Sequence, residues 1–199
     1  MGLGWPFELS EGRVGLRPLR YRDARQWRTL REANAAWLAP WEATSPDPQS
    51  PPLRFHRLVR TFNVEARAGR ALPFAITYDG AMVGQLSVAG IGWGSMRSAH
   101  IGYWVAQHVA GRAITPTAVA LVTDHCLFTL GLHRIEVNIR PENVASLRVV
   151  AKLGFRDEGL RRRYLHIDGA WRDHRTFALT REDLPGGLMT RYRSTRRPG

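Results

Sequence analysis

The feature that most constrains the fold is a junction between a short apolar strand and a long apolar helix near the middle of the 199 residues. Residues 100–105 (HIGYWV) predict a strand, and residues 118–128 predict a helix that is covered on most sides. The connecting stretch is His108-Val109-Ala110-Gly111-Arg112-Ala113-Ile114. A helix start leaves N–H groups without partners at the positive end of the helix dipole. The junction therefore predicts an anion site at which Gly111 and Ala113 let a diphosphate approach the backbone, unless Gly111 only turns the chain.

A second informative stretch follows the predicted strand over residues 134–139. Asn143 is expected to cap a helix that runs to residue 153, and Leu153-Gly154-Phe155 ends it. One stripe of this helix is expected to be buried, and it consists of Ser146, Val149, Val150 and Leu153. The chain thus contains two strand-to-helix units in succession.

Together, the two stretches resemble motifs A and B of the GNAT acetyltransferases, which bind acetyl-CoA. The family pattern Gln/Arg-x-x-Gly-x-Gly/Ala appears as His108-x-x-Gly111-x-Ala113, with histidine in the first place. Asn143-x-x-Ser146, the Leu-Gly-Phe run and Glu158-Gly159 are similar to the RimJ/RimL branch, which acetylates protein N-termini. The resemblance covers roughly residues 12 to 182 and implies acetyl-CoA as the acetyl donor.

The order of the other elements predicts an α/β (α+β) domain with a mixed, mostly antiparallel sheet flanked by helices, which is the GNAT layout. Asp79-Gly80 is a strong hairpin signal between two strands. We expect one domain over residues 1–184 and a basic, disordered tail over residues 185–199. The other expected elements are strands at 13–19, 74–78, 81–88, 161–167 and 175–180, a helix at 24–30 (capped by Asp23), a helix from residue 53 that stops near Gly69, and a loop at 46–52.

The formal net charge of +12 favours polyanions such as RNA, ribosomes or CoA itself. Nearly all of it is arginine, since Lys152 is the only lysine, and coding bias is an alternative explanation. No RNA-binding fingerprint is present. The single cysteine, Cys126, excludes an internal disulfide and is expected to be a core thiol. We expect a cytoplasmic protein without a signal peptide, membrane span or metal, either monomer or homodimer.

The resemblance assigns the donor-binding residues. The diphosphate would rest on the amides from Val109 to Ile114, with Arg112 nearby for charge. The pantetheine arm would pair with the backbone around Tyr103 and Val105, and Asn143 would hold the same arm. The complete expected set is Tyr103, Val105, His108, Val109, Ala110, Gly111, Arg112, Ala113, Ile114, Asn138, Asn143, Ser146, Val150 and Lys152.

For the general base, Glu136 is the first candidate, because it lies where the related RimI enzymes carry their proposed catalytic glutamate. The alternative is that Glu136 pairs with an arginine. His100 is the second candidate, since an imidazole pKa of about 6.5 suits the task. Ser146 matches the RimL-like serine near the sulfur and is the candidate general acid. In RimI-type enzymes the general acid is a tyrosine, but the matching position here is Val150, so that assignment fails. The later glutamate proposed for RimL aligns near Leu165, so it is absent or replaced.

Aromatic side chains are expected to shape the acceptor site. Trp37 and Trp41 stand beside the proline-rich loop and either line a slot or anchor the core. Near the last turn, Tyr164, Trp171 and Asp173 are candidates for acceptor contacts, and Asp173 can equally serve the turn. The predicted function is acetyl transfer by direct attack of a primary amine, most plausibly a protein N-terminus. A small-molecule amine acetyltransferase and a non-catalytic CoA- or RNA-binding module are the alternatives.

Overall fold

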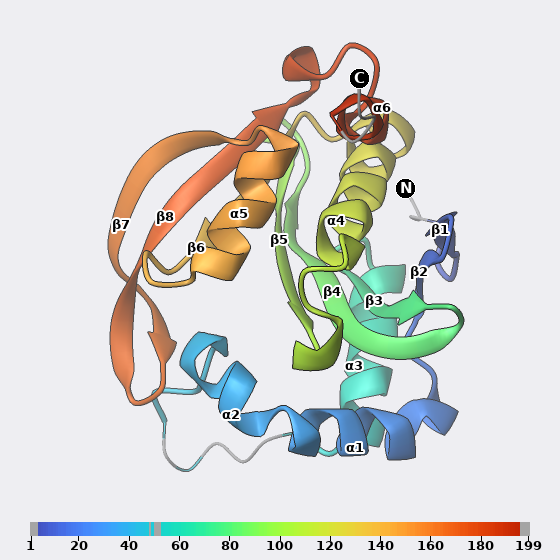
Figure 1. Cartoon of the computed structure of the whole chain (residues 1–199), viewed down its shortest axis with the longest axis vertical. Coiled ribbons are helices and arrows are strands. Elements are labelled where there is room, and N and C mark those ends of the chain that lie inside the picture. Colours follow the sequence, from blue (N-terminus) through green and yellow to red (C-terminus); the bar gives the residue numbers. More distant parts are fainter. Residues whose placement is uncertain (1–3, 48, 50–52, 196–199) are drawn as a thin grey trace.

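The computed structural model describes residues 4–47, 49 and 53–195, which fold around one eight-stranded sheet in the order β1-β2-β3-β4-β5-β6-β8-β7 (Figure 1). The mixed, mostly antiparallel sheet that the sequence predicts is confirmed, because β5 and β6 form its parallel pair and the other neighbours are antiparallel. The strands are β1 (Leu9–Glu11), β2 (Val14–Pro18), β3 (Leu72–Tyr78), β4 (Ala81–Gly92), β5 (Ser98–Val105), β6 (Arg134–Ile139), β7 (Arg156–Ile167) and β8 (Ala170–Thr180).

Helices form separate hydrophobic layers with the two faces of the sheet. Alternation along β3 shows this, since Phe74 and Ile76 belong to the core that contains α4 and α5, whereas Ala75 packs with Phe55 and Val59 of α3. The helices are α1 (Ala24–Ala33), α2 (Ala35–Leu38), α3 (Phe55–Arg67), α4 (Ile114–Asp124), α5 (Val144–Leu153) and α6 (Leu188–Ser194). The chain also has four short 3-10 helices, which are η1 (Tyr21–Asp23), η2 (Ala39–Trp41), η3 (Gln107–Val109) and η5 (Arg181–Asp183) in the described part. A π-helical turn, η4 (His125–Thr129), continues α4.

The sheet opens between β5 and β6. The two strands pair only from Ser98 to His100 against Arg134 to Glu136, although β5 continues to Val105 and β6 to Ile139. Beyond this point each strand is held from its other side, because β5 stays paired with β4 and β6 stays paired with β8. A gap therefore separates the ends of the two central strands (Figure 1).

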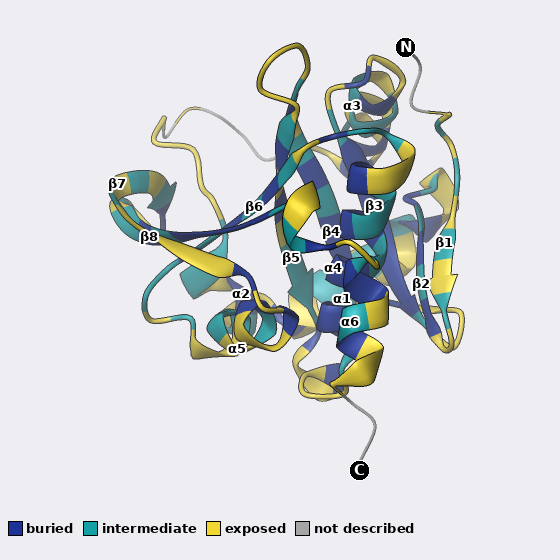
Figure 2. Cartoon of the chain, turned by 90° about the horizontal axis from the view of Figure 1, so that it is seen from above, coloured by how far each residue is buried: buried dark blue, intermediate teal, exposed yellow. Residues whose placement is uncertain are grey.

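The expected disordered tail is wrong for the described part of residues 185–195. Residues 188–194 form α6, whose side chains Leu188, Met189 and Tyr192 are buried in the main core (Figure 2). The Asp124 carboxylate of α4 accepts hydrogen bonds from the Leu188 and Met189 N–H groups at 2.6 and 2.9 Å. The segment is too short to show apolar periodicity, so only its packing on α4 reveals the helix. Residues 196–199 lie outside the described part.

Several smaller expectations also change. Strand β1 was not expected, and β7 and β8 both begin five residues earlier than the predicted strands at 161 and 175. Asp23 does not cap α1 with its side chain; it accepts from the Arg20 N–H at 2.7 Å and pairs with Arg17. Of the loop expected at 46–52, residues 48 and 50–52 lie outside the described part.

The packing of α6 leads to a stability prediction. We expect Leu188→Ala to destabilise the protein by about 2–5 kcal/mol, because it removes a fully buried side chain and leaves a cavity against α4. The control is Thr190→Ala, an exposed position of the same helix, which should change the free energy of unfolding by less than about 0.5 kcal/mol. Urea denaturation measures both variants, and equal midpoints would show that α6 is dispensable.

Candidate active site

The turn before α4 carries N–H groups that have no hydrogen-bond partner among the described residues. Gly111 and Ala113 adopt left-handed conformations with φ of 81° and 63°, and α4 begins immediately afterwards without a side-chain cap. Within the described residues, the N–H groups of Gly111, Ala113 and Ile114 have no hydrogen-bond partner. A Cβ built on Gly111 would meet nothing within 4 Å. The turn is therefore open, and its donors and helix dipole fit an anion such as a diphosphate.

Fewer amides are available to an anion than the sequence predicts, which expected all of those from Val109 to Ile114. The N–H groups of Val109 and Ala110 donate to Ala106 and Gln107 at 3.2 and 3.0 Å, and that of Arg112 approaches Val109 O at 3.4 Å. These three amides stabilise the turn itself rather than facing a ligand. The side chains of His108 and Arg112 are exposed, so both remain available to a phosphate.

Strand alternation places side chains of β5 and β6 on opposite faces of the sheet where the two strands separate. Tyr103 and Val105 of β5 pack against the core of α4 and α5. His100 and Glu136 are the last register pair before β5 and β6 separate, and they occupy the alternate positions, on the face that α1 covers. These side chains therefore lie on opposite faces of the sheet at the point where β5 and β6 separate.

On the α5 face, the hydroxyl group of Tyr103 is buried and has no hydrogen-bond partner within the described residues. Burial raises the pKa of Tyr103 far above its usual value, and the nearby Ser146 hydroxyl, although its geometry falls short of a hydrogen bond, partly offsets this effect. An unsatisfied buried hydroxyl costs free energy in the absence of a partner. The sequence analysis used only the backbone of Tyr103, although the alternation of β5 already placed its ring beside the later motif.

Asn143 caps α5 as predicted. Its side-chain oxygen accepts a hydrogen bond from the Ser146 N–H at 3.0 Å, which fixes the first turn of the helix and the position of Ser146. Val150 is only 1% exposed, so it packs in the core and is a poor candidate for contact with a donor molecule. Lys152 is exposed on the same helix.

Trp37 and Asn138 are already engaged inside the protein. The indole N–H of Trp37 donates to the Val105 carbonyl at 3.1 Å and occupies one of the two acceptor positions of that oxygen. Trp37 is thus an anchor between α2 and β5, which favours the core alternative over the slot. The side-chain oxygen of Asn138 accepts from the Thr176 hydroxyl at 2.8 Å across β6 and β8.

On the opposite face, Glu136 is held by two guanidinium groups. Its carboxylate pairs with Arg134 at 2.9 Å and with Arg161 at 3.0 Å, and its side chain is 19% exposed. This geometry is the ion-pair alternative that the sequence left open, and both oxygens are occupied. Glu136 is therefore a weaker base candidate than the sequence indicates.

His100 becomes the better base candidate. Desolvation lowers its pKa below the usual value of 6.5, while the charge of Glu136 raises it in part, so the ring is neutral at pH 7. Its ring also packs over Gly90 of β4, where an added Cβ would lie 2.9 Å from the imidazole atoms. A neutral, exposed imidazole at the branch of the two strands can accept a proton.

This assignment gives a pH prediction. A base with a lowered pKa is competent above that pKa, so kcat/KM should stay level at neutral pH and fall only as the pH drops below about 6.5. His100→Gln should reduce kcat/KM by about 10²-fold and abolish this acidic limb. Initial rates from pH 5 to 9 measure the profile. An unchanged limb in the variant would assign the proton transfer to another group.

The expected acceptor residues lie on η2 and on the β7–β8 hairpin. Trp41 is half-buried and stacks with Arg140, whose guanidinium also donates to the Pro40 carbonyl at 2.6 Å. Trp171 is 54% exposed and Tyr164 is half-buried, so both can meet a ligand. Asp173 accepts from the Arg163 N–H at 2.8 Å, which is the structural turn role. Arg140 could not be singled out from the sequence, because its contacts with Pro40 and Trp41 join positions about a hundred residues apart.

Other chemistries find little support in the described residues. Cys126 is buried, and burial raises the pKa of its thiol to about 12, so it is not a nucleophile. No group of three or more metal-ligating side chains occurs among the described residues. None of the helices in the described part of the chain has the length and apolar character needed to cross a membrane.

Comparison with known proteins agrees with this geometry. Residues 13–156 match the acetyltransferase (GNAT) domain family. The chain is 29% identical over 181 residues to the [ribosomal protein uS5]-alanine N-acetyltransferase of Escherichia coli, covering 90% of this chain and 93% of that protein. It is 38% identical over 105 residues to the probable N-acetyltransferase YjcK of Bacillus subtilis, covering 53% of this chain and 58% of that protein.

Among solved structures, RimJ of Mycobacterium smegmatis, in complex with CoA-disulfide, superposes with a TM-score of 0.92 at 42% identity. The match covers 99% of this chain and 98% of that one. The fold, the open turn and the matched residues define a GNAT acetyltransferase, and the chain belongs to that family. Within it, the protein is an acetyl-CoA-dependent N-acetyltransferase related to the RimJ/RimL ribosomal-protein enzymes.

Proposed function

We propose that this enzyme acetylates the α-amine of a protein N-terminus, such as that of a ribosomal protein, in the cytoplasm. The observation that carries the proposal is the gap between β5 and β6, which is flanked by hydroxyl groups on one face and by an imidazole on the other. The similarity to a uS5-alanine N-acetyltransferase over 90% of the chain supports a protein acceptor. An N-terminal peptide is narrow and flexible, so it can enter such a gap end-on.

The donor is held at the turn before α4. The N–H groups of Gly111, Ala113 and Ile114 bind its diphosphate, and Arg112 adds a positive charge. Acetyl-CoA supplies an activated thioester for attack by an amine. Asn143 contributes through α5, because its cap sets the place of Ser146.

The chain's own residues supply proton transfer on the two faces of the gap. His100 accepts a proton from the acceptor ammonium, which makes the amine nucleophilic. On the other face, the Ser146 hydroxyl, next to Tyr103, donates a hydrogen bond toward the departing sulfur. Holding the two reactants in line supplies a further large part of the rate. Trp41, Tyr164 and Trp171 line the acceptor approach.

A panel of acceptors tests the proposal. Thiol release from acetyl-CoA is measured with N-terminal peptides of ribosomal proteins, with the same peptides bearing a blocked α-amine, with small amines and with no acceptor. Release with free α-amines alone supports the proposal. Release with small amines alone would indicate a small-molecule enzyme, and tight CoA binding without release to any acceptor would indicate a binding module. Mass spectrometry of the peptide locates the acetyl group.

A further inference from the structure

The proposed reaction leaves the net charge of +12 unexplained. Several exposed arginines are concentrated on the segments that form η1, α1 and α3, and their side chains make no ion pair or hydrogen bond within the described residues. They are Arg22, Arg25, Arg28, Arg54, Arg57, Arg60 and Arg67, which we call the basic face. Ion pairs inside the protein therefore do not explain these arginines, and their charges remain available to a partner.

Other arginines in and beside these segments are paired, which makes the basic face distinct. Arg17, Arg31 and Arg70 each pair with a carboxylate, from Asp23, Glu42 and Glu65 respectively. These pairs consume most of the local acidic side chains. The exposed carboxylates of Glu32 and Asp47 are the remaining counter-charges in the described part of residues 20–70.

Helical spacing arranges the arginines of α3 in a stripe. Arg57 and Arg60 are one turn apart and Arg67 follows two turns later, so all three project from one side of the helix. Phe55 and Val59 are buried on the opposite side. From residue 57 to residue 67 the stripe is about 15 Å long at 1.5 Å per residue, which is enough to meet several phosphates of one strand.

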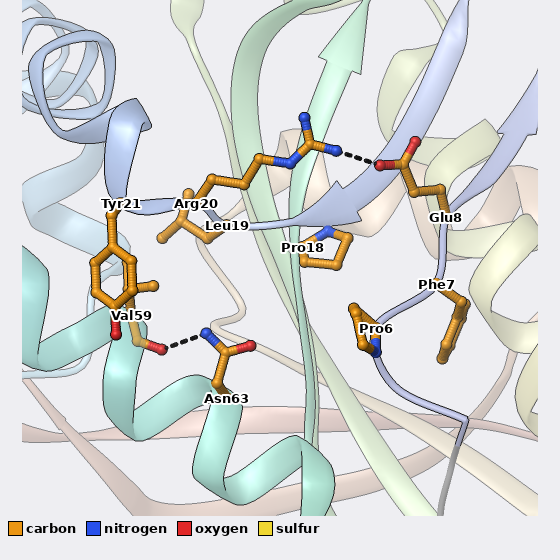
Figure 3. A pocket seen from close by; sticks show the side chains of 9 residues that line it. All are labelled: Pro6, Phe7, Glu8, Pro18, Leu19, Arg20, Tyr21, Val59 and Asn63. Atoms are coloured by element: carbon orange, nitrogen blue, oxygen red, sulfur yellow. Dashed lines mark hydrogen bonds and ion pairs between the residues drawn. The ribbon is translucent and has the colours of Figure 1, made fainter.

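An aromatic pair joins the two parts of the basic face. The rings of Tyr21 and His56 stack with centroids 5.6 Å apart and an interplanar angle of 18°, and Tyr21 is 52% exposed. Tyr21 also stands at the edge of a cavity lined by Pro18, Leu19 and Val59 (Figure 3). An exposed ring next to arginines is a platform on which a nucleobase can stack.

We propose that the basic face binds RNA, through its phosphates and through stacking on Tyr21. Arginine suits this partner because its planar guanidinium forms two parallel hydrogen bonds to a phosphate. An anionic membrane fits less well, because the outer side of α3 carries arginines with Val64 as its exposed large apolar residue. This inference goes beyond the proposed acceptor and does not depend on it.

The test uses a fluorescein-labelled, unstructured 20-nucleotide RNA and the full chain. Fluorescence anisotropy between 50 and 200 mM salt gives the affinity and its salt dependence. The variant Arg57→Gln, Arg60→Gln, Arg67→Gln should bind at least tenfold more weakly at 100 mM salt. Its slope of log K against log salt should shrink by about 2, since each lost phosphate contact removes about 0.7. Tyr21→Ala should weaken binding about tenfold with little change of slope.

The matched control is Arg13→Gln, Arg97→Gln, Arg181→Gln, which removes the same charge from exposed arginines outside the basic face. It should bind RNA within about threefold of the unmodified protein. Equal losses in the two triple variants, or no RNA binding by the unmodified protein at 100 mM salt, would overturn the proposal. Binding to phosphatidylserine vesicles or acidic peptides in place of RNA would also overturn it. Acetylation of a short peptide should be unchanged in the α3 variant, which separates this surface from the catalytic proposal.

Discussion

Gly111→Glu is expected to abolish CoA binding while leaving the fold intact. The new carboxylate would stand among the free N–H groups of the turn, where the diphosphate is proposed to bind. Two unit charges about 4 Å apart repel by about 4 kcal/mol at the effective dielectric of a protein surface. This corresponds to roughly a 10³-fold loss of affinity. Isothermal titration calorimetry with CoA measures it.

A glutamate at a φ of 81° also strains the backbone, so a control must carry the same strain. Gly94 has a φ of 72° and, like Gly111, open space where a Cβ would stand, but it lies in the turn between β4 and β5. Both variants should lose about 1–2 kcal/mol of stability. Only Gly111→Glu should lose CoA. Retained CoA binding by a folded Gly111→Glu protein would remove the turn from the donor site.

Ser146→Ala is expected to lower kcat by about 10²-fold with little change in the KM for acetyl-CoA. The hydroxyl is proposed to act only as negative charge develops on the sulfur, so its loss should affect the transition state rather than binding. The cap of α5 should survive, because Asn143 bonds to the backbone N–H of residue 146. Steady-state kinetics with the best peptide of the acceptor panel give both constants.

Tyr103→Phe extends this prediction. Among the described residues the buried hydroxyl of Tyr103 has no hydrogen-bond partner, so its removal should leave the stability unchanged or higher, while kcat falls about tenfold. In the double variant with Ser146→Ala, the losses should be less than additive if the two hydroxyl groups act together. Thr123→Val is the control, since the Thr123 hydroxyl is also buried and unpartnered but belongs to α4. Equal effects of the Tyr103 and Thr123 variants on kcat would contradict a special role for Tyr103.

Elements that depend on local rules could be predicted from the amino-acid order. Gly111 requires a left-handed conformation, Asn143 accepts the N–H of Ser146, and Asp79-Gly80 closes a hairpin, because each depends only on residues a few positions away. The apolar helix after the turn and the order of strands also followed from hydrophobic patterns. These features sufficed to predict the fold and the turn at which the donor is proposed to bind.

The partners of the polar side chains, in contrast, depend on how the elements pack together. In the folded chain, Glu136 pairs with both Arg134 and Arg161, and the Trp37 indole donates to the Val105 carbonyl. In the same way, α6 forms where it packs on α4, although the residues of α6 carry no helical signal of their own. Most of these contacts join positions far apart in the chain. The local sequence leaves several partners of similar energy open to each side chain, and the packing of the elements selects one of them.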